Sequence, residues 1–449
     1  MAEPDVEVTS EKVEDLLRGE ALEEAVDLIA SIHPADQAEL FTRLEPDLRP
    51  SFLALLSAEG LAHLLEHLEP EERQEVVEEM PRASLARVLD RIDNDVAADI
   101  LRELPPSEAA RVISTMTTAG DVAPLLEHAD ESAGGLMTRG FVALHGDMTA
   151  QDAINYMRLI RPNVEEAYYL YVMDAANRLQ GVVSLRELVV AAPDTPLREV
   201  MESDVISVGP ETDQEEVARL VQHYRLRALP VVDEDRHLLG ITTMDDAMDV
   251  VAEEATEDMY RMAGLPAEES VFDPVAVSAR RRLPWLILNL GAAFVAAGVV
   301  STFVDTIEDV VALAVFMPIV AGQGGNAGIQ TITLVVRQMA LGEVAPPDAW
   351  RVLRKELAVG LLKGIVMGLI VGAIAWVWWD NSWLGMVVGV AMLLNMLVAG
   401  FWGAVIPLGL RRLRLDPAIA SGIFLTTFTD VMGFLILLGL ATLLIDQLV

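Results

Sequence analysis

The stretch from Ala418 to Ile445 reads AIASGIFLTTFTDVMGFLILLGLATLLI and contains one acidic residue, Asp430, near its middle. About 20 consecutive apolar residues are enough to cross a bilayer as a helix, so this stretch predicts a transmembrane segment. A carboxylate at bilayer depth is costly and rare unless it faces a wet cavity or a cation. The stretch therefore predicts a membrane protein, and Asp430 makes cation passage the leading functional hypothesis.

Four further apolar stretches precede this one, and each is long enough to span a membrane. They are Leu283–Val304, Val310–Val336, Leu357–Trp379 and Trp383–Leu410, and none of them contains Asp or Glu. Basic residues cluster before the first span, between the second and third, and between the fourth and fifth, whereas the other two loops carry only acids. Because basic loops stay in the cytoplasm, we predict a multi-pass plasma (inner) membrane protein with cytoplasmic N-terminal domains and an external C-terminus.

The second span contains the segment PIVAGQGGNAG at Pro318–Gly328, with four glycines in seven residues. Glycine destabilises a helix and permits close backbone approach, so we expect this segment to interrupt the helix. Two roles stay open: close packing of helices through small residues, and irregular backbone that lines a pore. The pore interpretation assigns a pore-lining role to Gly325, Asn326 and Gly328, together with Thr426 on the last span. Asn395 is predicted to form an interhelical hydrogen bond instead of binding an ion.

The charge of the chain is concentrated in its first part. The 449 residues include no cysteine and carry a formal net charge of −37, and the negative excess lies in the first 278 residues. A nucleic-acid partner is not expected, because phosphate binding requires a basic surface. Without cysteine there are no disulfides or thiolate metal sites. Two interpretations of the acidic excess stay open: solvation in a salty environment, and sensing of divalent cations.

The part before the spans predicts two kinds of domain. Short amphipathic segments broken by prolines recur between residues 11 and 130, which is typical of helix pairs that stack as a superhelix. Residues 131–256 contain a diverged repeat, in which GVVSLRE at 181–187 is matched by GITTMDD at 240–246. Each repeat predicts strand, turn, strand and helix, so this part is expected to be a tandem module.

Acidic residues recur at helical spacing in two places. Asp95 and Asp99 share one helix face, and a second series follows the repeat at Asp246, Asp249, Glu253 and Glu257. Crowded like charges destabilise a helix unless cations or a basic partner neutralise them. Hard oxygen ligands suit Mg²⁺ or Ca²⁺, so the second series favours a cation site. For Asp95 and Asp99, a solvated acidic face remains the alternative.

The glycine, hydroxyl and acid that end each repeat resemble a cystathionine-β-synthase (CBS) domain pair, a family in which this motif often holds a nucleotide ribose. The order of acidic helical domain, CBS pair, acidic connecting helix and five spans resembles the MgtE family of magnesium channels. The segments PIVAGQGGNAGIQ (318–330) and TTFTDVMGF (426–434) are similar to the pore segments of that family. This resemblance covers nearly the whole chain and implies that two subunits enclose one pore.

The resemblance also implies roles for particular residues. Asp430 would hold a hydrated Mg²⁺ in the pore. Regulatory Mg²⁺ would be bound in the region of Asp95, Asp99, Asp246, Asp249, Glu254, Glu257 and Asp258. ATP would bind as a second regulator through Tyr169, Arg186 and Glu187. The chain departs from the family pattern at His63, where relatives often have a carboxylate, at Glu187, where Asp is more usual, and at Leu226, a position that can be aromatic.

We therefore predict a multidomain fold: an all-α superhelical N domain at 1–130, two α/β CBS domains at 131–196 and 197–256, a connecting (plug) helix at 257–279, and a five-helix transmembrane domain at 280–449. The predicted function is a homodimeric Mg²⁺-selective channel, closed by cytosolic Mg²⁺, with membrane lipid as its surroundings. One alternative is a CBS-regulated, nucleotide-sensing secondary transporter of a divalent cation, which would need a coupling ion. The other is a membrane enzyme, for which the spans offer no nucleophile and base, so we predict that the protein is not an enzyme.

Overall fold

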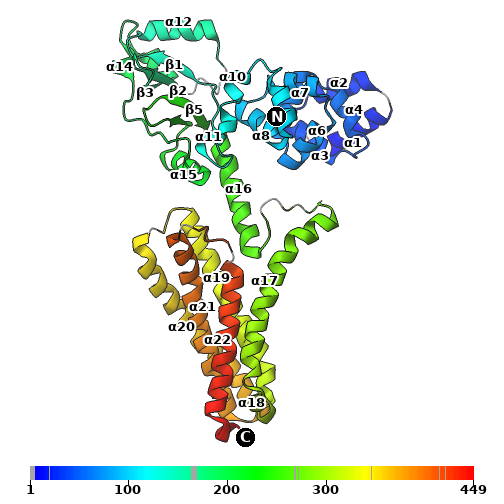
Figure 1. Ribbon diagram of the computed structural model, residues 1–449, viewed down its shortest axis with the longest axis vertical. Helices are drawn as coiled ribbons and strands as arrows, with labels where there is room; N and C mark the ends of the chain where they lie inside the picture. The colour runs from blue at the N-terminus through cyan, green and yellow to red at the C-terminus, as the bar shows by residue number, and fades with distance from the viewer. Residues whose placement is uncertain are drawn as a thin grey trace. The chain divides into compact units, whose positions relative to one another are not determined.

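The computed structural model describes residues 6–19, 21–162, 169–266, 269, 271, 273–344, 346–413, 415–419 and 421–449. The chain divides into two compact units, Met1–Val251 and Ala252–Val449 (Figure 1). Each unit has hydrophobic clusters of its own. Helix α16 begins in the first unit and ends in the second.

The first unit opens with a stack of short helices. Helix α3 packs against α5, α5 against α7, α7 against α9, and α6 against α8, as expected for a superhelix of helix pairs. Proline at the first helical position starts α3 and α9, where the missing N–H costs nothing. The helices are α1 (Val6–Arg18), α2 (Leu22–Ala30), α3 (Pro34–Arg43), α4 (Arg49–Leu55), α5 (Ala58–His67), α6 (Pro70–Glu79), α7 (Arg82–Leu89), α8 (Asn94–Glu103), α9 (Pro106–Ile113) and α10 (Ala119–Val122), followed by the 3₁₀ helix η1 (Leu125–Glu127).

The tandem repeat forms two small sheets with helices around them. Strand β1 pairs in parallel with β2, β2 pairs antiparallel with β3, and β4 pairs antiparallel with β5. The antiparallel pair of each repeat carries the same register shift near its turn, so the two repeats share one local design. The elements are α11 (Ala133–Leu136), β1 (Val142–His145), α12 (Ala150–Ile160), β2 (Tyr169–Met173), β3 (Leu179–Ser184), α13 (Leu185–Val190), α14 (Leu197–Val200), α15 (Gln214–Tyr224), β4 (Ala228–Val232), β5 (Leu238–Thr243) and α16 (Met244–Ala263).

The predicted connecting helix at 257–279 is not one continuous helix. Helix α16 ends at Ala263, and Gly264 follows with a φ of 75°, the left-handed conformation that commonly ends a helix. The next helix begins at Val275. Residues 267, 268, 270 and 272 of the predicted helix lie outside the described residues.

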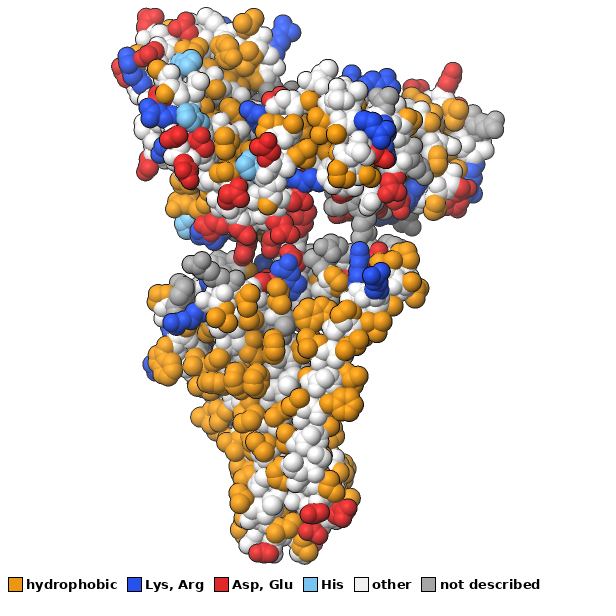
Figure 2. Space-filling model, in the orientation of Figure 1, with side chains coloured by type: hydrophobic (Ala, Val, Ile, Leu, Met, Phe, Trp, Pro, Cys, Tyr) orange, Lys and Arg blue, Asp and Glu red, His pale blue; other side chains and the backbone are white. Residues whose placement is uncertain are grey.

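The second unit contains five helices that are long and apolar enough to cross a membrane, which confirms the predicted number of spans. Figure 2 shows hydrophobic side chains over the middle of this unit, Lys and Arg gathered towards one end, and Asp and Glu at the other end. The elements are α17 (Val275–Ser301), α18 (Val304–Asp309), α19 (Ala312–Ala340), the 3₁₀ helix η2 (Pro346–Asp348), α20 (Ala349–Trp379), α21 (Ser382–Arg412), α22 (Ser421–Leu443) and α23 (Ile445–Leu448).

The expected break in the second span is wrong, because α19 runs without interruption through the glycine-rich segment. Packing explains the difference. Gly324, Gly325 and Gly328 are buried, and the missing side chains allow α21 and α22 to approach α19 closely. Tertiary contact therefore outweighs the low helix propensity of glycine at this position.

Helices α20 and α21 pack backbone to backbone along a series of glycines. A Cβ added at Gly368 would lie 2.6 Å from the carbonyl oxygen of Gly389, and one at Gly372 would lie 2.7 Å from that of Gly385. Neither space admits a side chain. The spacing of four residues places glycines on one face of α20, which is the small-residue packing typical of membrane helices. These glycines are Gly360, Gly364, Gly368 and Gly372.

Candidate functional site

Asp430 lies on α22 within the membrane-length helices and is half-buried. Its carboxylate makes no hydrogen bond or ion pair with any described residue. The neighbouring hydroxyls are satisfied differently: Thr426 donates to the carbonyl of Gly422 (3.0 Å) and Thr429 to that of Leu425 (3.1 Å). Such bonds to the preceding turn occupy the hydroxyl protons. Within the described residues, Asp430 is therefore an unpaired carboxyl group on the membrane-length helix α22.

The glycine-rich segment of α19 faces α22 close to Asp430. A Cβ added at Gly325 would lie 3.9 Å from the Thr429 hydroxyl, whereas one at Gly328 would lie only 2.7 Å from the buried Leu425 side chain. The structure therefore gives Gly328 a packing role, the first of the two roles left open by the sequence. Asn326 is exposed and lines a cavity of about 350 Å³.

Asn395 on α21 forms the predicted interhelical hydrogen bond. Its fully buried side chain donates from Nδ2 to the carbonyl oxygen of Val320 on α19, at 2.8 Å. A Cβ added at Gly324 would collide with this amide, and one at Gly433 on α22 would lie 2.9 Å from it. The amide thus links α21 to α19 and packs against α22 beside the glycine-rich segment.

Sequence reasoning missed Glu356, because its basic neighbours made the segment resemble a loop. Helix α20 begins at Ala349, so Glu356 lies inside a long apolar helix, with its side chain only 5% exposed. Its Oε2 accepts a hydrogen bond from the Thr331 hydroxyl at 3.1 Å, and its Oε1 lies 3.1 Å from Nζ of Lys355. Asp430 is therefore not the sole acid of the spans when the spans are taken as these helices.

In the first unit, Asp95 on α8 and Asp246 on the first turn of α16 form a pair of half-buried acids. Burial raises the pKa of Asp95 well above its usual value, and the charge of Asp246 raises it further. Burial also raises the pKa of Asp246, whose Oδ2 accepts hydrogen bonds from Thr243 N (3.0 Å) and Oγ1 (2.7 Å). Oδ1 of Asp95 has no hydrogen-bond partner among the described residues. A divalent cation between the two carboxylates would relieve their repulsion.

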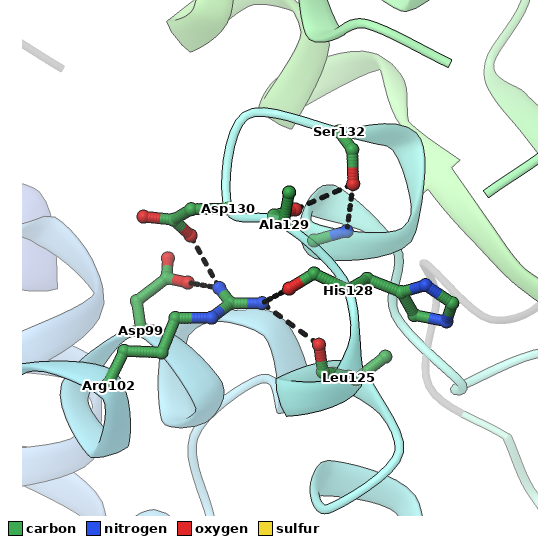
Figure 3. A network of polar contacts seen from close by, with 8 residues as sticks. Asp99, Arg102, Leu125, His128, Ala129, Asp130 and Ser132 are labelled. Carbon is green, nitrogen blue, oxygen red and sulfur yellow. Dashed lines mark hydrogen bonds and ion pairs between the residues drawn. The ribbon is translucent and has the colours of Figure 1, made fainter. Parts of the chain in front are cut away.

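Asp99 does not join that pair but belongs to a network around Arg102 (Figure 3). Nη1 of Arg102 donates to Asp99 Oδ1 at 2.7 Å and to Asp130 Oδ1 at 2.5 Å. Nη2 donates to the carbonyl oxygens of Leu125 (2.9 Å) and His128 (3.4 Å). Burial, followed by the charge of Asp130, raises the pKa of Asp99 to about 7. Arg102 therefore ties α8 to the segment that enters the CBS pair.

The C-terminal half of α16 carries three of the predicted sensor acids, and the structure places them near one residue that the sequence did not identify, Asp416. Arg261 forms ion pairs with both Glu257 and Asp416. Burial, then the charges of Asp416 and Glu254, raise the pKa of Asp258 to about 6. Asp258, Glu254 and Asp416 thus form an acidic region at the end of α16, partly neutralised by Arg261.

Two other residues of the expected sensor, Asp249 and His63, lie outside these two acidic regions. Burial, then the charge of Asp245, raises the pKa of Asp249. His63, which departs from the family pattern, places Nδ1 3.1 Å from Oε2 of Glu66. Within the described ranges, no group of three or more His, Asp or Glu side chains is arranged closely enough to hold a metal ion.

The residues predicted to bind ATP gather at one end of β2, β3 and α13. Tyr169 is the register partner of Ser184, and Oε2 of Glu187 accepts hydrogen bonds from Ser184 N (2.9 Å) and Oγ (2.8 Å). Arg186 is exposed on the same helical turn. The hydroxyl and acid of the motif thus cap α13, as Thr243 and Asp246 do at the start of α16. Residues 163–168, next to Tyr169, lie outside the described part.

Family models match most of the chain. The MgtE intracellular N domain matches residues 32–131, the CBS domain matches residues 133–194 and 197–253, and the MgtE divalent cation transporter matches residues 317–440. The magnesium transporter MgtE of Thermus thermophilus is 40% identical over 334 residues, which is 73% of this chain and 73% of that protein. MgtE of Enterococcus faecalis is 38% identical over 324 residues, or 72% of this chain and 71% of that protein.

Two solved structures resemble the chain. The soluble part of a magnesium transporter is 33% identical with a TM-score of 0.51, over 56% of this chain and 100% of that one. The cytosolic domain of the Mg²⁺ channel MgtE in complex with ATP is 36% identical with a TM-score of 0.51, over 54% of this chain and 99% of that one. The predicted fold class, with a helical N domain, a CBS pair and apolar helices, is confirmed.

Proposed function

This chain belongs to the MgtE family of divalent cation transporters, and we propose that it is a homodimeric, Mg²⁺-selective channel that closes when cytosolic Mg²⁺ is high. It is a multi-pass membrane protein with soluble N-terminal domains. One observation carries the proposal: the Asp430 carboxylate has no partner among the described residues, although it lies within a membrane-length helix. Three relatives that are 37–40% identical over 72–73% of this chain are named magnesium transporters, which supports the choice of ion.

The chemistry of Mg²⁺ supports a pore that holds the ion through its water shell. Mg²⁺ gives up water reluctantly and keeps several waters when it binds proteins. Two Asp430 carboxylates, one from each subunit about a twofold axis, would face such a hydrated ion with charge and hydrogen-bond acceptors. Gly325 would bring backbone close to the same path, and Asn326 and Thr426 would complete the lining.

The acids of the cytoplasmic half support the proposed closure by Mg²⁺. Asp95 and Asp246 lie close together and are half-buried, and Asp258 lies near Asp416, so both places favour a bound cation or a proton. A ligand that prefers one conformation shifts the population towards it. Mg²⁺ bound by these acids, with Asp249, Glu254, Glu257 and less directly Asp99, would favour a compact, closed state.

The remaining parts of the proposal concern organisation and regulation. The chain comprises the N domain (1–130), the CBS domains (131–196 and 197–256), a connecting segment (257–279) and the pore domain (280–449). The N-terminal domains face the cytoplasm and the C-terminus lies outside. ATP regulates the channel through Tyr169, Arg186 and Glu187, which agrees with the ATP complex of the related cytosolic domain.

The test is Mg²⁺ flux into liposomes by wild-type protein and by Asp430→Asn. A hydrogen bond to a charged group contributes roughly 1.5–3 kcal/mol, so we expect roughly 10- to 100-fold weaker Mg²⁺ binding in the pore of the variant. Asp446→Asn, which removes one charge from the short helix α23, is the matched control and should conduct normally. Wild-type flux and selectivity in Asp430→Asn would contradict the pore assignment.

A secondary transporter remains a second candidate because of Glu356. The predicted spans contained one acid, Asp430, whereas the structure places a second and buried carboxylate, Glu356, within α20. A channel carries Mg²⁺ downhill regardless of the proton gradient. A coupled transporter instead accumulates Mg²⁺ against its gradient when a proton gradient is imposed, and Glu356→Gln would abolish that accumulation.

A further inference from the structure

A basic cavity lies at the beginning of α20. Its volume is about 450 Å³, and its lining consists of Pro347, Trp350, Arg351, Arg354 and Lys355. The indole of Trp350 is 66% exposed, and both arginines are exposed. None of these residues belongs to the candidate pore or to the acidic regions.

The two arginines of this cavity have unused hydrogen-bonding capacity. Neither Arg351 nor Arg354 makes a hydrogen bond or ion pair within the described part of the chain. By contrast, four other arginines of the same unit are partnered: Arg261, Arg281, Arg282 and Arg411. Two acids lie nearby. Glu356 is shared between Lys355 and Thr331, and Asp348 precedes the helix, so the surplus charge at the cavity is positive.

An exposed apolar stripe continues from the cavity along the same helix. Steps of three and four residues from Arg354 lead to Leu361, Ile365 and Leu369, which are 44%, 42% and 70% exposed. Leu362, 66% exposed, widens the stripe. In a membrane helix such side chains face acyl chains. The positive charge at the cavity matches the headgroup of an anionic phospholipid, and the apolar stripe next to it matches the acyl chains.

We propose that this cavity is a binding site for one anionic phospholipid, with its phosphate held by Arg351 and Arg354 and its acyl chains along the apolar stripe of α20. Planar guanidinium groups bind phosphate oxygens bidentately. Trp350 belongs at the headgroup level, where indole rings are enriched. Anionic lipids attract basic residues near the membrane surface. The proposed lipid site goes beyond the proposed function, because lipid binding at this cavity does not depend on which ion the protein transports.

The experiment is native mass spectrometry of the full-length protein in detergent, titrated with phosphatidylglycerol or with phosphatidylcholine of the same chains. Each basic residue near anionic lipid strengthens binding roughly fivefold, so Arg351→Gln/Arg354→Gln should weaken phosphatidylglycerol binding roughly 20- to 30-fold. Arg351→Lys/Arg354→Lys keeps the charge, so its loss of phosphatidylglycerol binding should be less than about a third of the loss in the glutamine variant. Arg280→Gln/Arg412→Gln removes two exposed charges from other helices and should bind like the wild type.

Three results would overturn the proposal. The first is equal binding of the two lipids by the wild type. The second is an equal loss in the Arg280→Gln/Arg412→Gln control, which would show that only net charge matters. The third is displacement of phosphatidylglycerol by inorganic phosphate, which would make the cavity a site for soluble anions. If the neutral variant fails to fold by size-exclusion chromatography, the lysine variant and the phosphate competition still decide.

Discussion

Two glycines three residues apart on α19 make opposite predictions for the same substitution. At Gly325 an added Cβ would have its nearest neighbour at 3.9 Å, which is ordinary contact. At Gly328 it would lie 2.7–2.9 Å from three side-chain atoms of Leu425, which is fully buried. Gly325→Ala should therefore be accommodated, and Gly328→Ala should strain the packing of α19 against α22.

The magnitude follows from two opposing terms. Alanine favours a helix over glycine by roughly 0.8–1 kcal/mol, and both variants gain this equally. Overpacking a well-packed core costs roughly 1–3 kcal/mol, and only Gly328→Ala incurs it. The variants should differ by that second term. For a unit of this size each kcal/mol corresponds to roughly 2–4 °C, so Gly328→Ala should melt roughly 2–12 °C below Gly325→Ala.

The assay is thermal unfolding in detergent, followed by Mg²⁺ flux in liposomes on the same preparations. Flux separates packing from conduction. If Gly325 lines the ion path, Gly325→Ala should conduct less Mg²⁺ while melting no lower than the wild type. A melting temperature of Gly328→Ala equal to or above that of Gly325→Ala would refute the reasoning from geometry.

Three further predictions concern the first unit. Arg102→Met leaves Asp99 and Asp130 facing each other without a cation, so chemical denaturation should show the unit destabilised by roughly 2–4 kcal/mol; no change would mean that the network is incidental. The pKa of Asp99 is raised to about 7, so its contribution to stability is fully present below pH 3.8 and is lost as pH rises through 7. Because the Asp99 side chain is 39% exposed, the free energy involved is limited to roughly 1–2 kcal/mol. Asp99→Asn should flatten that part of the curve of unfolding free energy against pH. Asp246→Ala should require several-fold more Mg²⁺ than the wild type for protease protection of the cytoplasmic half, whereas the exposed Asp235→Ala should not; protection that monovalent salt reproduces at equal ionic strength would favour solvation as the role of the charge.

The sequence predicted those parts of the fold that depend on local pattern. Hydropathy predicted five spans, and the repeated motifs at Ser184 and Thr243 predicted two copies of one module. It misplaced the start of α20, because a hydropathy pattern records where apolar residues begin, whereas the helix continues through the basic residues before them. Glu356 was missed for that reason. The glycine-rich segment was expected to break α19, since glycine propensity is visible in a sequence and the compensating contact with Leu425 is not.

The candidate sites followed the same division. The placement of Asp430 on a membrane-length helix was predictable, because the sequence itself shows a lone carboxylate within an apolar run. The closeness of Asp95 and Asp246 was not, since these residues lie on helices far apart in the sequence. Spacing alone grouped Asp95 with Asp99, and only the fold reveals that Asp99 is paired with Arg102. Asp416 entered the acidic region through tertiary contact with α16 and had no local signal.

The glycine packing of α20 against α21 has a mechanical consequence. Each helix has 31 residues, so each is about 46 Å long at about 1.5 Å per residue, whereas the hydrocarbon layer is about 30 Å thick. Because their backbones are in contact, the two helices resist bending and behave as one rigid pair. Such a rigid pair adapts to a thinner or thicker bilayer by tilting as a whole, and the free-energy cost is a fraction of a kcal/mol per Å of hydrophobic mismatch. The acyl-chain length of the host membrane therefore sets the tilt of this helix pair. Because Asn395 on α21 is hydrogen-bonded to α19, a change of tilt is also transmitted to the helix that carries the glycine-rich segment.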